Sequence, residues 1–409
     1  MWQKIKNLYH LGQAFLYASF YHFPARHLNV IGVTGTDGKT TTVNLIYHIL
    51  KEAGKKVSMI SSINVVIGEK KYETGFHVTT PNPRDMQKYL SQAVKAGSEY
   101  FVLEATSHGL GQNRLFGCFF NIGVVTNITH EHLDYHKTYQ NYVKVKAKLF
   151  KIAEVAVLNK DDRSYPFLLP FCKKRKCFTY SLDKKADFNL KNFKFETALP
   201  GKYNQSNSLA ASAVALSLGI TRKKIKKSLK TFKGIKGRME EIKRGQDFKI
   251  IIDFAHTPNS LKNVLEILNK EKKQDNKLIA IFGAAGLRDK KKRSLMGKVS
   301  GKYADITVIT AEDPRTEDLN KIIEKIAQGC LRGGASELDR NDFELKGKRH
   351  YFFRVPDRKE AIAFAIRKLA KKDDIVVICG KGHEKTMCFG KKEYPWSDFK
   401  AVEESLDKK

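Results

Sequence analysis

The sequence predicts an α/β fold with two domains, each built on a mostly parallel sheet, the second of them smaller and Rossmann-like. Three observations predict it. Short apolar segments typical of buried strands alternate with segments of helix length along most of the chain. This alternation favours parallel pairing, because parallel strands need a crossover between them. The length of 409 residues suits two or three domains, and Gly234 and Gly237 mark a hinge near the middle.

The first 27 residues are expected to form one helix that ends at a break at Pro24. One face of this helix is partly apolar and carries Ile5, Leu8, Leu11 and Phe15. We expect this face to pack on the next domain, and a role at a membrane surface is the alternative. The predicted domains are an N-terminal helix (a remnant or linker), a central domain and a C-terminal domain, over 1–28, 29–236 and 237–409.

The central domain begins with a buried-type strand at 27–33, a glycine-rich turn and a helix at about 40–53. Further short strands are expected at 57–60, 100–104, 122–126 and 155–159. A turn and an alanine-rich helix follow within 194–219, and then a basic helix at 223–232.

The C-terminal domain has predicted strands at 249–253, 278–282, 306–310 and 375–379. Each of them ends in polar or glycine residues. Open α/β sheets bind ligands beyond the carboxyl ends of their strands, so we expect functional residues at these positions.

Net charge, apolar runs and cysteine content indicate which kinds of partner and which cellular location to expect. The net charge is +32, but the lysines are spread along the chain and no nucleic-acid-binding motif accompanies them. We therefore expect a surface that suits an anionic small-molecule substrate, with nucleic-acid binding as the alternative. No apolar run is long enough to span a bilayer, no signal peptide is visible, and the six cysteines form neither a disulfide framework nor a zinc pair. A cytoplasmic location is expected.

A glycine-rich motif follows the first strand and opens the next helix, Gly32-Val33-Thr34-Gly35-Thr36-Asp37-Gly38-Lys39-Thr40-Thr41. Glycines let backbone N–H groups converge on phosphate oxygens, and the helix N-terminus adds positive potential. Lys39 would reach the β- and γ-phosphates, and the Thr40 hydroxyl would bind Mg²⁺. Val33 stands where the strict Walker pattern has glycine. The strand–loop–helix context still favours a nucleotide site over a chance glycine turn.

This loop resembles the ATP loop of the Mur ligases, which build the peptide stem of the bacterial cell wall, and most of all that of the member that adds the third residue. Further motifs extend the resemblance from about residue 20 to 400. In the central domain they are Thr79-Thr80-Pro81, Glu104-Ala105-Thr106-Ser107-His108-Gly109-Leu110 with Gln112 and Arg114, Thr126-Asn127-Ile128-Thr129 and Glu131-His132-Leu133-Asp134-Tyr135-His136. In the C-terminal domain they are Asp253-Phe254-Ala255-His256-Thr257-Pro258, Arg288-Asp289, Lys292-Arg293 and Gly380-Lys381-Gly382-His383-Glu384.

Two departures from the family pattern stand out. Family members carry an N-terminal domain that grips the UDP part of the substrate, whereas only about 28 residues precede the loop strand here. The family motif that selects the amino acid is usually Asp-Asn-Pro-Arg, and here it reads Glu312-Asp313-Pro314-Arg315.

The resemblance implies a central P-loop ATP-binding domain and an ATP-dependent ligase that activates a carboxylate as an acyl phosphate. Cations must offset the repulsion between that carboxylate and the triphosphate. The implied catalytic residues are Lys39, Glu104, His132, Lys146 and Arg238. The implied ligands of two Mg²⁺ ions are Thr40, Glu104, His132 and Lys146 as a carbamate. The implied ATP contacts are Thr34, Gly35, Thr36, Asp37, Gly38, Lys39, Thr40, Thr41, Asn204, Asn207, Arg238 and Asp253.

Several of these residues also allow a purely structural interpretation. Glu104 alone could be a salt-bridged carboxylate, His132 a hydrogen-bonded loop histidine, and the two asparagines helix caps. Lys146 lies between Lys144 and Lys148, which suggests a solvated basic helix. The order of the motifs favours the catalytic roles. Because the phosphate loop and Arg238 lie in different domains, domain closure is expected to assemble the site and exclude water.

The resemblance also implies two substrate sites. The muramoyl-dipeptide acceptor would be held by Thr79, Thr80, Thr106, Gln112 and Arg114. The incoming amino acid would be held by Arg288, Glu312, Asp313, Arg315, Gly380 and Glu384. A cation such as Arg315 suits the distal carboxylate of meso-diaminopimelate through a bidentate pair, and lysine has no such carboxylate. The acidic pair 312–313 works against this choice, so lysine or another amine stays an alternative.

The predicted function is therefore peptidoglycan precursor synthesis, with roles in cell shape and division. A ligase of the same superfamily that acts on a folate, a polypeptide or a lipid-linked acceptor is the close alternative. A non-catalytic nucleotide binder or a nucleic-acid-binding ATPase is the distant one. The expected partners are small-molecule substrates, with a protein that supplies the UDP-binding function as a further possibility, and a monomer is expected.

Overall fold

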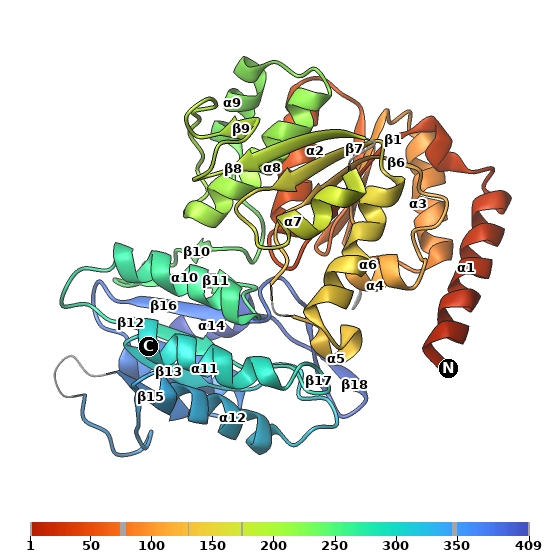
Figure 1. Cartoon of the computed structure of the whole chain (residues 1–409). Helices are drawn as coiled ribbons and strands as arrows, with labels where there is room; N and C mark the ends of the chain where they lie inside the picture. The colour runs from red at the N-terminus through yellow and green to blue at the C-terminus, as the bar shows by residue number, and fades with distance from the viewer. Residues whose placement is uncertain (1, 74–78, 130, 173–174, 346–349, 408–409) are drawn as a thin grey trace. The chain divides into compact units, whose positions relative to one another are not determined.

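The computed structural model describes residues 2–73, 79–129, 131–172, 175–345 and 350–407. The chain divides into two compact units, Met1–Lys233 and Gly234–Lys409 (Figure 1). Each unit is built on a mostly parallel sheet, which confirms the predicted α/β fold class. Within the described ranges, no helix is both long enough and apolar enough to cross a membrane.

The sheet of the first unit has nine strands among the described residues, in the order β4-β3-β2-β5-β1-β6-β7-β8-β9. They span β1 Asn29–Thr34, β2 Val57–Ile60, β3 Asn64–Ile67, β4 Lys70–Glu73, β5 Tyr100–Glu104, β6 Phe120–Val125, β7 Val155–Asn159, β8 Lys176–Ser181 and β9 Phe188–Asn189. Among these strands the antiparallel pairs are β2 with β3 and β3 with β4. The chain crosses from one side of β1 to the other between β5 and β6, so β1 lies at a topological switch point, where open α/β sheets bind ligands.

Helices connect these strands. They are α1 Trp2–Phe20, η1 Pro24–His27, α2 Lys39–Glu52, α3 Pro83–Lys95, α4 Ser107–Gly111, α5 Leu133–His136, α6 Tyr139–Ile152, α7 Tyr165–Leu168, η2 Leu169–Cys172, α8 Lys202–Ser217 and α9 Arg222–Thr231. The first helix ends earlier than predicted, at Phe20, because Phe23 adopts a left-handed conformation and Pro24 opens a separate 3₁₀ turn.

The second unit holds a seven-stranded sheet within the described residues, in the order β10-β11-β16-β12-β13-β15-β14. Its strands are β10 Glu240–Ile242, β11 Lys249–Asp253, β12 Leu278–Phe282, β13 Ile306–Ile309, β14 Ser336–Glu337, β15 Tyr351–Arg354 and β16 Ile375–Cys379. The first, β10, is antiparallel, and β17 Thr386–Phe389 and β18 Lys392–Pro395 form a separate hairpin.

Alternate residues of the central strands enter two cores, as the two-residue period of a strand requires. Leu278 and Ala280 pack in a core with α10 Pro258–Glu271, α11 Lys291–Tyr303 and α12 Leu319–Arg332. Ile279 and Ile281 pack on the other face with α13 Arg358–Phe364, the π-helix η3 Ala365–Leu369 and α14 Asp398–Leu406. The near-continuous apolar character of these strands reflects burial on both faces.

Candidate functional site

The glycine-rich loop lies at the carboxyl end of β1 and is held by the segment after β6. The backbone N–H of Thr36 donates to the carbonyl of Asn127 at 2.7 Å. The Asn127 amide and the Thr126 hydroxyl both donate to the carbonyl of Asp37, at 3.1 and 2.7 Å. Neighbouring strands therefore fix the shape of the loop before any ligand binds.

Gly38 is a residue of the loop at which both the backbone and the surrounding space require glycine. Its φ is +82°, and a Cβ there would lie 2.4 Å from Asn207 Oδ1. Asn207 lies on α8 and is buried, and its amide donates to Asn204 Oδ1 at 3.3 Å. Asn204 in turn donates to the carbonyl of Pro200 at 2.8 Å. The two asparagines thus join the start of α8 to the loop. Neither is the helix cap that the alternative expected, because the N-cap of α8 is Gly201 and no side chain caps the helix there.

Two lysines converge on the loop backbone. Lys39 donates to the carbonyls of Gly35 and Thr36, at 3.1 and 2.8 Å. Lys146, on α6, donates to the same Gly35 carbonyl at 2.6 Å and is only 1% exposed. Burial, and next the charge of Lys39, lower the pKa of Lys146 well below its ordinary value. The fully solvated helix that the spacing of lysines suggested is therefore wrong for Lys146, because its side chain points inward.

Glu104 lies beside the loop. It is the last residue of β5 and pairs with Val33 of β1. Its carboxylate is 1% exposed and accepts from the backbone N–H of Ser62 at 2.6 Å and from the Ser62 hydroxyl at 3.1 Å. The same hydroxyl donates to Thr79 Oγ1 at 3.1 Å. Both of these donors belong to Ser62 and are neutral, so these contacts are hydrogen bonds and not the salt bridge that the alternative expected for Glu104.

The residues predicted to hold the acceptor form one hydrogen-bonded cluster. Thr80 Oγ1 lies 2.7 Å from Thr106 Oγ1 and 3.0 Å from the carbonyl of Glu104. Arg114 donates to the carbonyl of Thr80 at 3.0 Å and to Gln112 Oε1 at 2.8 Å. The tertiary structure thus brings segments 79–80 and 104–114 together next to the phosphate loop.

A group of aromatic rings surrounds His132, and the sequence did not single out most of its members. The ring centroids of His108 and His132 are 5.0 Å apart, and those of His136 and Tyr142 are 4.9 Å apart. Burial lowers the pKa of His136 to about 3, and its Nε2 lies 3.0 Å from Ser107 Oγ. Tyr142 lies under Lys146, with Nζ 4.6 Å from the ring centroid, and its hydroxyl lies 3.3 Å from Thr36 Oγ1.

No group of three or more His, Cys, Asp or Glu side chains in the described ranges is arranged to hold a metal ion. The metal ligands that the resemblance implies include a hydroxyl, Thr40, and a modified lysine, Lys146, which are not among those residue types. Hydroxyl and carboxylate-like oxygens suit Mg²⁺, which keeps several waters and binds phosphate oxygens. The donor set is compatible with Mg²⁺ on these chemical grounds.

In the second unit Asp253 ends β11 and organises the residues around it. Its carboxylate accepts from the backbone N–H groups of Met239 and Ala255, each at 2.7 Å. Burial raises the pKa of Asp253, and the neighbouring Arg238 opposes the shift. The Arg238 guanidinium lies 4.4 Å from the ring centroid of Phe254.

The predicted amino-acid site gathers at the carboxyl ends of β13 and β16. Glu312 is 6% exposed, and a Cβ on Gly380 would lie 2.4 Å from its Oε2. Burial raises the pKa of Glu312 to about 7. Asp313 accepts from Lys381 Nζ at 2.8 Å, and Lys381 also pairs with Glu384 at 2.5 Å. The added acidity of this motif is therefore largely balanced within the unit.

Arg315 follows in the same segment. Its backbone N–H donates to the carbonyl of Cys388 at 3.0 Å, and its guanidinium donates to the carbonyl of Gly286 at 3.2 Å. Arg288, two residues after Gly286, is exposed. Arg358 was not singled out from the sequence. It donates to the carbonyls of Ala311 and Cys379, which precede Glu312 and Gly380, and it forms a fully buried ion pair with Asp398.

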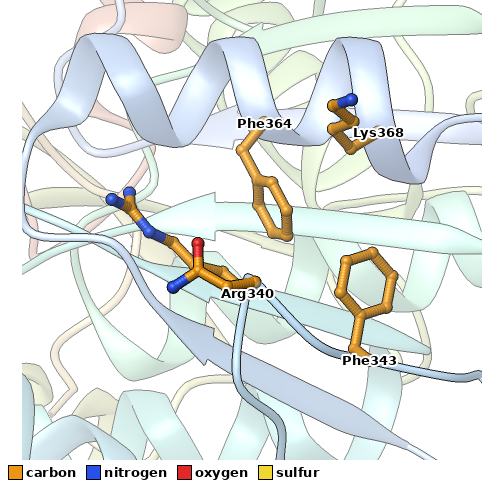
Figure 2. A pocket seen from close by; sticks show the side chains of 5 residues that line it. Arg340, Phe343, Phe364 and Lys368 are labelled. Atoms are coloured by element: carbon orange, nitrogen blue, oxygen red, sulfur yellow. The ribbon is translucent and has the colours of Figure 1, made fainter.

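A separate cavity of about 500 Å³ lies elsewhere in the second unit. Figure 2 shows Phe343 and Phe364 facing it together with Arg340 and Lys368. Arg340 pairs with Glu360 at 2.8 Å, and the two phenylalanine ring centroids are 5.8 Å apart. None of its lining residues belongs to the predicted substrate sites.

Comparisons with known proteins agree with this arrangement. The model of the Mur ligase middle domain matches residues 33–215, and that of the Mur ligase glutamate ligase domain matches residues 237–382. A UDP-N-acetylmuramoyl-L-alanyl-D-glutamate–2,6-diaminopimelate ligase of Caldanaerobacter subterraneus is 36% identical, and the match covers 95% of this chain and 80% of the relative.

Solved structures are similar as well. A structure of a UDP-N-acetylmuramoyl-L-alanyl-D-glutamate–2,6-diaminopimelate ligase has a TM-score of 0.60 at 31% identity, covering 93% of this chain and 78% of the other. A folylpolyglutamate synthase of Mycobacterium tuberculosis has a TM-score of 0.69 at 15% identity, covering 90% and 92%. The latter likeness shows the shared fold alone.

Proposed function

Because the chain belongs to the Mur ligase family, we propose that it adds meso-diaminopimelate to a muramoyl-dipeptide acceptor, in an ATP-dependent reaction that forms an amide bond. Several relatives that are 34–37% identical over most of the chain are named for this reaction, which supports the choice of substrates. The product would be a precursor of peptidoglycan.

One observation carries the proposal in the first unit. A continuous set of hydrogen bonds runs from Arg114 through Thr80 to Glu104, at the strand next to the phosphate loop. An acceptor carboxylate held by the cationic end of this network would lie near the triphosphate that the loop binds. This proximity lowers the entropic barrier of the reaction.

We assign the chemistry as follows. An oxygen of the acceptor carboxylate attacks the γ-phosphorus of ATP, and the bond to the β-phosphate oxygen breaks, which leaves ADP. The amino nitrogen of the incoming residue then attacks the acyl carbon, loses a proton, and phosphate leaves. Lys39 would stabilise charge on the transferred phosphoryl group, and Arg238 and Asp253 of the second unit are assigned the γ-phosphate and ribose contacts.

Lys146 is proposed to carry a carbamate. Its amine is buried and its pKa is lowered, so the neutral form that attacks carbon dioxide is favoured. The nitrogen lone pair forms a bond to the carbon of carbon dioxide, a C=O π pair moves onto oxygen, and the nitrogen loses a proton, which leaves an anionic carbamate in place of a neutral amine. With Glu104, His132 and Thr40, this group would hold Mg²⁺ when the ion is bound, and the metal would neutralise phosphate charge. Two ions are proposed.

The second unit is proposed to select diaminopimelate. Arg315 offers a guanidinium that suits a distal carboxylate. Lys381 balances Asp313 and Glu384, and the raised pKa of Glu312 reduces its negative charge near neutral pH. The Glu312-Asp313 sequence therefore repels the distal carboxylate of the substrate less than two fully charged, unpaired carboxylates would.

The test is a screen of ADP release that crosses UDP-linked and lipid-linked muramoyl-dipeptides with diaminopimelate, lysine and other amino acids. We expect release that needs a muramoyl acceptor and diaminopimelate. Lys39→Ala should lower the rate by about 100-fold, whereas Lys51→Ala, at the exposed far end of the same helix, should not. Turnover with lysine alone would refute the role of Arg315, and the absence of turnover with every muramoyl acceptor would refute the assignment.

A further inference from the structure

Helix α1 presents a wide apolar face that its packing leaves exposed. The helix contacts α3 and lies at the edge of the first unit (Figure 1). Its residues Ala14 and Ala18 are fully buried. The opposite side is exposed to between 54% and 69% at its large apolar residues, Ile5, Leu8, Tyr9, Phe15, Leu16 and Phe20. Their spacing of three, four and seven residues places them on one stripe of the helix.

The exposed surface continues beyond the helix through aromatic contacts. The ring of Phe15 lies 6.3 Å from that of Phe116, and Phe23 lies 6.2 Å from Phe119, as measured between ring centroids. Phe116 and Phe119 are 41% and 46% exposed. The Arg26 guanidinium lies over Phe23 at 4.8 Å and over Phe119 at 5.3 Å, measured to the ring centroids. We call the exposed α1 stripe together with these residues the apolar face.

The N-terminal segment that forms most of this face carries charge of one sign. Residues 1–36 contain no aspartate or glutamate, whereas they contain Lys4, Lys6 and Arg26. Lys6 and Arg26 are exposed. An amphipathic helix with aromatic and leucine residues on one side and cations beside them is suited to the boundary between anionic lipid headgroups and acyl chains.

We propose that the apolar face docks on an anionic membrane surface, with α1 lying in the plane of the interface. A second copy of the chain is a poorer occupant, because a symmetric contact would bring the same cations together with no acidic residue from this segment to balance them. The lipid headgroups supply the missing negative charge.

Docking would bring the acceptor cluster close to the membrane. The Asn113 side-chain amide lies 3.5 Å from the carbonyl of Asn7 on α1, and Asn113 is next to Arg114 of that cluster. His10, on the packed side of α1, has a pKa lowered by burial and next by the charge of Arg114. The helix thus carries most of the apolar face and also contacts the residue next to Arg114.

The test is co-sedimentation of the full chain with vesicles. We expect binding to vesicles of phosphatidylglycerol and phosphatidylcholine in equal parts, weak binding to phosphatidylcholine alone, and loss of binding as salt rises. The pair Lys6→Gln and Arg26→Gln should weaken binding by about thirtyfold, since each cation near an anionic surface contributes about fivefold. The pair Leu16→Glu and Phe20→Glu should abolish it.

Leu331→Glu is the matched control, because Leu331 is 54% exposed on α12 of the second unit. It should bind vesicles as the unmodified chain does. Equal binding by all variants, or no binding to anionic vesicles, would overturn the proposal. A third result would also overturn it: the chain sediments as a dimer, and only the double variant Leu16→Glu with Phe20→Glu dissociates that dimer. This result would assign the apolar face to contact with a second copy of the chain. Amino-acid-dependent ADP release with a water-soluble acceptor serves as the check that each variant is folded.

Discussion

Lys146 shows how much a single buried side chain can reveal. Its amine is 1% exposed, donates to the carbonyl of Gly35 and lies over the ring of Tyr142. Burying a charged amine is costly unless it is paired, and the Gly35 carbonyl and the Tyr142 ring are both neutral. The structure thus favours the neutral amine, which is the form that carbamate chemistry requires.

We predict that Lys146→Ala lowers the rate of amino-acid-dependent ADP release by about 100-fold, because a metal-binding anion is lost. Adding a small carboxylate such as formate or acetate should restore part of the rate. Lys148→Ala, two residues further on the same helix at an exposed position, should stay close to the unmodified rate. Full activity of Lys146→Ala would rule out the carbamate, and the intact mass of the protein gives an independent measurement.

Glu312 leads to a prediction about stability. Its pKa is about 7 in the folded chain against an ordinary 4.5. Between these values the folded chain binds more protons than the unfolded one, so the free energy of unfolding falls as pH rises, by up to about 3 kcal/mol. In the absence of substrates, the Glu312→Gln variant should therefore be more stable than the unmodified chain at pH above about 7. Near pH 4.5, the ordinary pKa of glutamate, the two should have similar stability.

Denaturant unfolding over a pH series measures this difference. Glu271→Gln, at an exposed position on α10, is the control and should show no gain that grows with pH. A constant difference between Glu312→Gln and the unmodified chain at all pH values would contradict the assignment of the titration to Glu312.

At the scale of elements, the phosphate loop depends on a helix far along the chain. Asn207 of α8 fills the space beside Gly38, and the β1–α2 turn closes around it. The glycine motif predicted a loop of this kind between a strand and a helix. It did not predict the identity of the residue that packs against the loop at each point.

We predict that Gly38→Ala lowers the rate of ADP release by about 100-fold, because the added Cβ would lie 2.4 Å from Asn207 Oδ1 and displace the loop. Gly54→Ala is a close control. Gly54 has nearly the same φ, +84°, but a Cβ there meets nothing within 4 Å. Both substitutions should cost about 1–2 kcal/mol of stability from the left-handed backbone, and only Gly38→Ala should lose activity. Equal activities would show that the loop tolerates the contact.

For the whole molecule, the second unit depends on a fully buried ion pair. The side chains of Arg358 and Asp398 are both 0% exposed. The guanidinium also donates to the carbonyl of Ala311, two residues after β13, and to that of Cys379, the last residue of β16. Arg354 is a useful contrast, because it pairs with Glu324 and Glu337 at the surface.

Arg358→Leu should lower the free energy of unfolding by about 3–5 kcal/mol, since it leaves a buried carboxylate unpaired. Arg354→Leu should cost about 1 kcal/mol or less. Denaturant unfolding, with hydrogen exchange of residues 234–409 to locate the effect, measures both. Similar losses for the two variants would contradict the role given to burial.

The sequence by itself determined the fold class and most buried strands. The strands at 100–104, 155–159, 249–253, 278–282 and 375–379 have the same bounds in the structure, because a strand buried on both faces leaves a continuous apolar signal. The β3–β4 hairpin and the short edge strands were not predicted. Although β3 is buried, it is only four residues long, and β4 is largely exposed, so neither has a strong hydrophobic pattern. The motif order also predicted that Lys39, Glu104 and the residues of the acceptor cluster belong to one site, and their roles there stay predictions.

Only the tertiary structure decided what each of these residues touches. Ser62 on Glu104, Tyr142 under Lys146, Asn207 against Gly38 and Arg358 behind Glu312 join positions that are tens of residues or more apart in most cases. Such contacts depend on strand order and helix packing rather than on local sequence. The same holds for α1, where local apolar spacing could not distinguish the buried side from the exposed one, because that distinction is made by where α3 lies.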